Sequence, residues 1–134
     1  MEDKEHRILN FRTIFLCWNL SLTLNILSTG ETLTYIGNLP FQLLSLESCG
    51  LGGILPSSIY NSTSLIKINV YKNKLSSSLP EDLCSNLPAV QFVDLGNNLF
   101  SGNIPREIGN CTSFTNFYLS GNQLTGNVTS SYSS

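Results

Sequence analysis

One pattern recurs along most of the chain at a nearly constant spacing, and this period constrains the fold more than any other feature of the sequence. An Asn or a Cys, which we call the anchor, stands at positions 49, 73, 98 and 122. Around each anchor the same slots recur: apolar residues five and three positions before it and two positions after it, then a Gly or a Ser four positions after it. A period of this kind predicts a solenoid, in which each turn contacts only the turns beside it.

The slots also predict the structure of each turn. The two apolar residues before the anchor alternate with other residues, so each pair points one way from a short strand, and strands of successive turns should pair in parallel. These pairs are Leu44/Leu46, Ile68/Val70, Val93/Leu95 and Phe117/Leu119. A buried amide at the anchor would satisfy backbone groups of its own turn and of the neighbouring one, and a small thiol is a tolerated substitute. We assign this structural slot to Cys49, Asn73, Asn98 and Asn122.

Together the slots make the leucine-rich repeat pattern, L-x-x-L-x-L-x-x-N/C-x-L. The predicted fold is an α/β repeat solenoid, a right-handed superhelix of about 4–5 turns with a concave parallel β-sheet. The segment after each Pro slot is too irregular for a long helix. No capping sequence is visible at either end, so we expect an uncapped stack.

The sequence divides into four segments according to how well it fits this pattern. They are a charged tail predicted to be disordered at residues 1–7, a degenerate N-terminal turn at 8–35, the clear turns at 36–128, and a Ser-rich tail predicted to be disordered at 129–134.

The degenerate turn admits two registers, which the sequence leaves open. One places Ile14 in the first strand slot and Asn19 at the anchor, and the other places Leu20 and Asn25 there. The apolar run over residues 14–27 is interrupted by Asn, Ser and Thr, and it is too short and too polar to span a bilayer. The acidic start and the lack of a small-residue cleavage site argue against a signal peptide.

Composition excludes several classes of function. The net charge is −2 and no basic stripe occurs, which argues against nucleic-acid binding. With a single histidine in the charged tail, we expect no metal site and no cofactor. Two of the four cysteines, Cys49 and Cys111, fall on slots that face the core, and no CxxC occurs. This placement favours free buried thiols over a disulfide framework.

The slots between the strand leucines should face solvent on the concave side, where a partner would bind. Two columns cross the predicted strands, one through Leu43, Lys67, Phe92 and Asn116 and the other through Ser45, Asn69, Asp94 and Tyr118. Exposed aromatic rings near charged groups are typical of a protein or peptide contact, although they also occur as ordinary solvated strand residues. The candidate ligand-binding residues are Lys67, Asn69, Tyr71, Lys72, Phe92, Asp94, Asn97, Asn116 and Tyr118.

Four N-x-S/T sequons are candidate glycosylation sites, at Asn19, Asn61, Asn110 and Asn127. Asn61 and Asn110 share one offset within the repeat, on the predicted convex return, where a glycan has room. Two sequons at the same offset indicate an extracellular parent protein, although sequons also arise by chance in chains rich in Asn and Ser.

One stretch carries a resemblance to a known family. The run from Asn98 to Asn110, N-x-F-x-G-x-I-P-R-E-I-G-N, resembles the plant extracellular subtype of leucine-rich repeats. The runs at 36–39, 58–65 and 79–88 look like ectodomain repeats of plant leucine-rich repeat receptor-like serine/threonine kinases. That resemblance implies a secreted solenoid, a single transmembrane helix and a cytoplasmic kinase. No kinase motif or spanning helix occurs in this chain, so kinase activity cannot belong to these residues.

Three functions compete. The first is a non-catalytic binding segment of a receptor-like kinase at the extracellular face of the plasma membrane. Its partners would be a peptide or protein ligand and a co-receptor with leucine-rich repeats, with no membrane contact by this segment itself. The second is an enzyme inhibitor of the polygalacturonase-inhibitor type. Those proteins carry a similar Gly-x-Ile-Pro repeat, but their capping cysteine pairs are missing here. The third is a truncated gene fragment with no activity. Enzyme activity has the lowest expectation, because no nucleophile–base or metal constellation is present.

Overall fold

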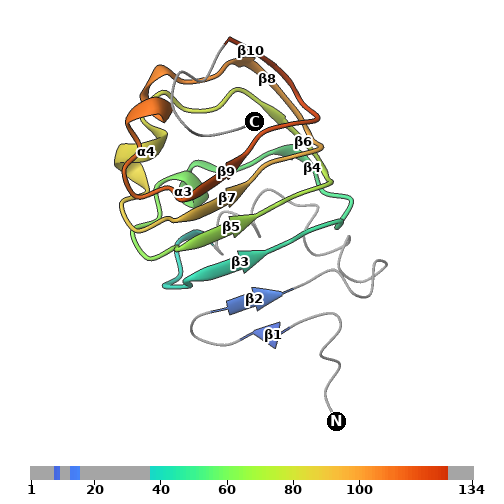
Figure 1. Ribbon diagram of the computed structural model, residues 1–134. Helices are drawn as coiled ribbons and strands as arrows, with labels where there is room; N and C mark the ends of the chain where they lie inside the picture. Colours follow the sequence, from blue (N-terminus) through green and yellow to red (C-terminus); the bar gives the residue numbers. More distant parts are fainter. Residues whose placement is uncertain (1–7, 10–12, 16–36, 127–134) are drawn as a thin grey trace.

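The computed structural model describes residues 8–9, 13–15 and 37–126, and within them the chain coils into a leucine-rich-repeat solenoid with two sheets (Figure 1). The first sheet has the order β1-β2-β3-β5-β7-β9. Its strands are β1 (Ile8–Leu9), β2 (Thr13–Phe15), β3 (Leu43–Ser45), β5 (Lys67–Asn69), β7 (Phe92–Asp94) and β9 (Asn116–Tyr118). From β2 to β9 all pairs are parallel, as the repeat predicts, whereas β1 pairs antiparallel with β2.

A second parallel sheet, which the sequence pattern did not predict, follows each anchor. Its strands are β4 (Gly52–Ile54), β6 (Lys74–Ser77), β8 (Leu99–Asn103) and β10 (Gln123–Thr125). Each turn is staggered against the next, so that Gly52 faces Lys74 and Ser76 faces Leu99. The convex connections are short, as expected: α3 (Ser57–Tyr60), α4 (Leu83–Asn86) and the 3-10 helix η1 (Arg106–Asn110). Figure 1 shows α3 and α4 gathered on one side, opposite the strands of the second sheet.

Two slots in each turn have positive φ, and they place the bends between the sheets. The residue before each anchor is in the left-handed region, at Ser48, Lys72, Asn97 and Gly121. The residue four positions after each anchor also has positive φ, at Gly53, Ser77, Gly102 and Gly126. Glycine avoids the steric cost of this conformation, which explains why three of the four turns carry it in the second slot.

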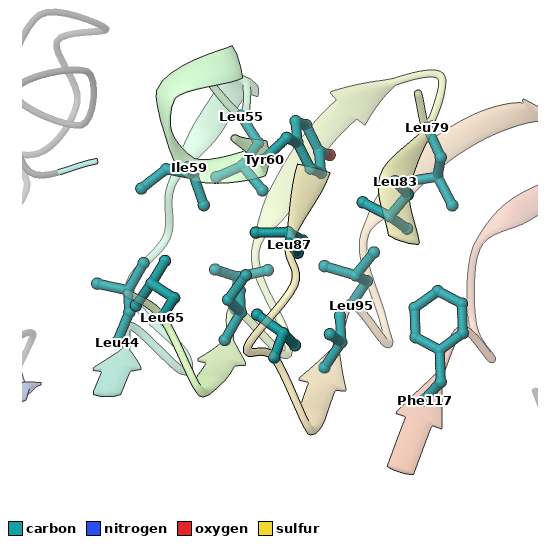
Figure 2. Close-up of a cluster of buried hydrophobic side chains, with 14 of the residues drawn as sticks. Leu44, Leu55, Ile59, Tyr60, Leu65, Leu79, Leu83, Leu87, Leu95 and Phe117 are labelled. Atoms are coloured by element: carbon teal, nitrogen blue, oxygen red, sulfur yellow. The ribbon is translucent and has the colours of Figure 1, made fainter. Parts of the chain in front are cut away.

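The core lies between the first sheet and the convex connections, and it is built from the apolar slots of all turns. Figure 2 shows Leu44, Leu95 and Phe117 rising from the first sheet toward Leu55, Ile59 and Leu83. Leu44 is 1% exposed, Ile59 is 0% exposed and Leu83 is 1% exposed. Each turn therefore buries its apolar residues against its neighbours, which a single turn could not do alone.

The anchor amides make the backbone contacts that the pattern predicts. Asn73 Oδ1 accepts from the backbone N–H of Leu51 at 2.9 Å, one turn back, and Asn73 Nδ2 donates to the carbonyl of Leu46 at 2.9 Å. Asn73 Nδ2 also donates to Val70 in its own turn at 2.8 Å. Asn98 and Asn122 repeat this arrangement one and two turns further on.

Strand pairing selects between the two registers of the degenerate turn. Ile14 of β2 lies opposite Leu44 of β3. This pairing places Ile14 in the first strand slot, as the first of the two registers requires. The predicted anchor of that register, Asn19, and the predicted tails at 1–7 and 129–134 lie outside the described residues.

The prediction of free buried thiols was wrong. Cys84 and Cys111 form a disulfide with their Cα atoms 5.4 Å apart, and Cys49 is disulfide-bonded as well. Cys84 lies in α4 and Cys111 directly follows η1, on neighbouring convex connections. A separation of 27 residues is one turn plus a short excess, so stacking of the turns brings the two sulfur atoms together. The repeat period already accounted for the spacing of the cysteines, so the sequence carried no separate sign of this disulfide.

Candidate concave binding surface

The first sheet brings the two predicted columns together with the expected register. Leu43, Lys67, Phe92 and Asn116 are paired in one column, and Ser45, Asn69, Asp94 and Tyr118 are paired in the other. Side chains at paired positions of neighbouring parallel strands are about 4.8 Å apart at their backbones, so they contact one another along each column. A partner lying across the strands would meet a continuous row of side chains.

An aromatic strip, formed by Lys67, Phe92, Asn116 and Tyr118, crosses β5, β7 and β9. The Lys67 Nζ lies 4.9 Å from the centroid of the Phe92 ring, within the range of a cation–π contact. The Phe92 and Tyr118 rings meet edge to face, with centroids 5.7 Å apart and an interplanar angle of 60°. Asn116 Nδ2 donates to the Tyr118 hydroxyl at 2.9 Å. These contacts hold the rings in place, although Tyr118 is 37% exposed.

A polar row, formed by Glu47, Asn69 and Asp94, lies beside the aromatic strip. Asn69 Nδ2 donates to Glu47 Oε1 at 3.0 Å, and Asn69 Oδ1 accepts from the Tyr71 backbone N–H at 3.0 Å. Asn69 was predicted to face solvent, but it is only 8% exposed, and both ends of its amide are hydrogen-bonded to residues that follow β3 and β5. Asn69 therefore stabilises this face through its hydrogen bonds and offers little surface to a partner. Glu47, its acceptor, is not among the candidate site residues although it occupies the same repeat slot as Tyr71, and its contact with Asn69 in the next turn is what the sequence pattern does not contain.

Asp94 is the titratable group with a perturbed environment on this face. Its Oδ1 accepts from the Gly96 backbone N–H at 2.9 Å. Partial burial raises the pKa of the Asp94 carboxyl, the negative charge of Glu47 adds to the rise, and the Gly96 hydrogen bond and Lys67 oppose both. Because partial burial disfavours the charged form of Asp94, a cationic group brought close by a partner would stabilise the carboxylate.

The rim of the surface follows the positive-φ slot of each turn. Asn97 Nδ2 donates to the Tyr71 hydroxyl at 3.2 Å, which joins two neighbouring turns at the edge of the sheet. Gly96 makes room for this arrangement, since a Cβ there would lie 3.2 Å from Tyr71 Cδ1 and 3.0 Å from Asp94 Oδ1. Lys72 is exposed on the same edge. All nine candidate ligand-binding residues therefore belong to one face or its rim.

No group of three His, Cys, Asp or Glu side chains that could hold a metal ion occurs in the described part of the chain. Over the same residues, no helix has the length and apolar character needed to cross a membrane. Away from this face, Asn61 and Asn110 are exposed on the convex side, while Asn19 and Asn127 lie outside the described ranges.

The fold and its repeat define a leucine-rich-repeat protein, and the family profile for the leucine-rich repeat matches residues 89–111. The chain is 36% identical over 113 residues to MDIS1-interacting receptor like kinase 1 of Arabidopsis thaliana, a match that covers 84% of this chain and 11% of that protein. It is 27% identical over 108 residues to receptor-like protein EIX1 of Solanum lycopersicum, covering 81% of this chain and 10% of that protein. The chain thus spans about a tenth of the length of these relatives.

Solved structures agree with these relatives. The plant peptide hormone receptor RGFR1 in complex with RGF2 matches with a TM-score of 0.65 and 32% identity, over 71% of this chain and 15% of that chain. The Arabidopsis receptor kinase HAESA, in complex with the peptide hormone IDA and the co-receptor SERK1, matches with a TM-score of 0.58 and 28% identity, over 73% and 16%. The chain is therefore a leucine-rich-repeat segment related to the ectodomains of plant receptor-like proteins and receptor kinases.

Proposed function

We propose that this chain is part of the extracellular leucine-rich-repeat domain of a plant receptor and that its concave face recognises a peptide or protein ligand. The aromatic strip is the observation that carries this proposal. Phe92 and Tyr118 are large rings already fixed by their neighbours, so little side-chain entropy is lost when a partner covers them. Tyr is among the residues that carry most of the binding energy at protein interfaces, and Phe is enriched at their buried centres.

The relatives support the setting of this proposal. The solenoids of RGFR1 and HAESA are each in complex with a peptide hormone, and HAESA also with a co-receptor, so we infer a peptide ligand and a second solenoid as partners. Disulfide-bonded cysteines fit an oxidising compartment, which supports a location outside the cell for this segment. The similarity to receptor kinases supports a serine/threonine kinase elsewhere in the parent protein, on the cytoplasmic side of the plasma membrane.

The test is a binding experiment on the secreted protein. A library of random extended peptides is panned against the wild-type protein, and the tightest clone becomes the probe. Replacing Phe92, Asp94 and Tyr118 together by Ala should weaken binding of that probe at least about tenfold, because truncating one buried aromatic contact commonly costs more than 1 kcal/mol. The matched control is Ile54→Ala on the second sheet, which removes a side chain that is 66% exposed and away from this face.

Circular dichroism of both variants checks that the solenoid is intact. Equal affinity of the probe for the wild type and the triple variant would place the site elsewhere. An equally large loss of affinity in Ile54→Ala would also show that the binding site does not lie on the concave face alone.

A further inference from the structure

We propose that Asn61 and Asn110 both carry N-linked glycans, and that the Cys84–Cys111 disulfide limits glycosylation at Asn110 but not at Asn61. The proposal rests on the extracellular location proposed above, because both modifications take place on the secretory route. It concerns the convex side, which the proposed ligand contact does not use.

The two sequons are structural equivalents two turns apart. Asn61 is the C-cap residue of α3, and Asn110 is the last residue of η1. Both asparagines and both sequon threonines, Thr63 and Thr112, are exposed, while the central residue of each sequon is buried. Beside Asn61 a hollow of about 590 Å³ is lined by α3, by the segment after it and by residues 37–40. Each asparagine thus projects from the convex surface, where a branched sugar has room.

The central residue is what distinguishes the two sequons. Ser62 is 6% exposed, and its Oγ accepts from the Leu65 backbone N–H at 3.2 Å, a contact that breaks whenever the segment opens locally. Cys111 is 3% exposed and is bonded covalently to Cys84. The backbone N–H of Cys111 donates to the Ile108 carbonyl at 3.2 Å, as that of Ser62 does to the Ile59 carbonyl at 3.4 Å, so both sequons follow a tight turn and only the disulfide sets them apart. Once the disulfide has closed, this sequon cannot extend into a transferase site.

Two reactions therefore compete for the segment from Asn110 to Thr112. Glycan transfer forms a bond between the anomeric carbon of the sugar and Asn110 Nδ2. It breaks the bond from that carbon to a lipid-linked diphosphate, which leaves as the Nδ2 proton is lost. Disulfide closure moves two electrons from the Cys84 and Cys111 thiols to a disulfide oxidant, which takes up the two protons as a dithiol. Cys84 enters the oxidising compartment before Asn110, so closure can begin as soon as Cys111 arrives.

The experiment measures glycan occupancy at each asparagine by mass spectrometry of the full chain directed to the secretory route of plant cells and extracted from the cells and the medium together. Cys84→Ser removes the disulfide and leaves the sequon at Asn110 unchanged. Cys111→Ser makes that sequon Asn-Ser-Thr, identical to the one at Asn61, and excludes pairing of a freed Cys111 with another cysteine. Occupancy at Asn110 should rise at least about twofold in both variants, because transfer no longer races a reaction on a scale of seconds to hours. Occupancy at Asn61 should not change.

Transfer acts on the unfolded segment, so the readout does not depend on correct folding of either variant. A second measurement, brief treatment of cells making the wild-type protein with dithiothreitol, should raise Asn110 occupancy in the same way. Equal Asn110 occupancy in the wild type and Cys84→Ser overturns the proposal, and so does a bare Asn110 in all three proteins. In either case a glycan at Asn61 would still support the proposed extracellular location. A bare Asn61 would contradict both that location and the glycosylation proposal.

Discussion

The two sides of the solenoid obey different rules. On the concave side the strands β3, β5, β7 and β9 have the same length and register, and the three asparagine anchors make the same contacts. On the convex side the connections differ: α3 and α4 are α-helical turns, η1 is a 3-10 helix, and a disulfide joins the connections of α4 and η1. The concave side is regular because closely stacked turns leave buried backbone groups that only a fixed geometry satisfies. The convex side has to satisfy fewer such groups and is free to vary.

The largest effect is expected from removing an anchor amide. Asn98 is 4% exposed, and its side chain satisfies Leu75 N–H, Val70 C=O and Leu95 C=O across two turns. Asn98→Ala should lower the free energy of unfolding by about 4 kcal/mol, because several buried backbone groups lose their partners at once. Urea denaturation followed by circular dichroism measures the change. Ser85→Ala on the exposed convex side is the matched control and should cost well under about 1 kcal/mol. Equal losses in the two variants would break the comparison.

Replacing Tyr60 is expected to change the free energy of unfolding less, and in the opposite direction. In the described part of the chain its buried hydroxyl is an unsatisfied polar group that the convex side tolerates. Tyr60 is 7% exposed, and within the described residues its hydroxyl has no hydrogen-bond partner. Figure 2 shows this ring among the leucines beneath the convex connections. Tyr60→Phe should stabilise the protein by about 1 kcal/mol, since it removes an unsatisfied buried polar group. Thermal unfolding measures the shift, and a destabilised variant would mean that the hydroxyl is satisfied.

The same substitution has a signature in alkaline solution. Burial raises the pKa of the Tyr60 hydroxyl far above its usual range. The unfolded chain ionises this group at about pH 10, whereas the folded chain does not, so ionisation favours unfolding as the pH rises above that value. The wild type should therefore lose more stability than Tyr60→Phe above about pH 10.

Ser77 offers a test at the bend into the second sheet. Its φ is 88°, in a slot where Gly53 and Gly102 both have φ of 83°. Ser77→Gly should stabilise the protein by up to about 1 kcal/mol, because it relieves a steric cost that exceeds the entropy gained by the unfolded chain. Ser76→Gly, at the preceding residue, should instead destabilise it by about 0.5 kcal/mol. Denaturant midpoints of the two variants that moved in the same direction would contradict this account.

The smallest effect concerns acid and the polar row. Because the folded pKa of Asp94 is raised above its unfolded value, the folded state binds the proton more tightly, and this group favours folding more as the pH falls through that range. Asp94→Asn should remove this gain while leaving stability at neutral pH equal or slightly higher. Unfolding midpoints measured from pH 7 to pH 4 compare the two proteins, and parallel curves would show that Asp94 does not titrate in this way.

The sequence predicted the first sheet and its anchors, and it missed the second sheet and the contacts that occur once. The columns through Lys67 and Asp94 and the contacts of Asn98 follow from a pattern seen four times, so each was predictable in register. The second sheet was hidden because its residues include Gly and Ser, which have low strand propensity and read as a bend. The disulfide and the burial of Asn69 depend on contacts between particular turns, and no periodic pattern contains that information.

The hydrogen bonds of the anchor asparagines all run in one direction along the solenoid. Each anchor amide reaches back to the turn before it: Asn73 to Leu51, Asn98 to Leu75 and Asn122 to Phe100. A turn that has just left the ribosome therefore holds unsatisfied backbone groups until the next asparagine arrives, and each new turn completes its predecessor. Such a chain is suited to being built from its N-terminus at the pace of synthesis.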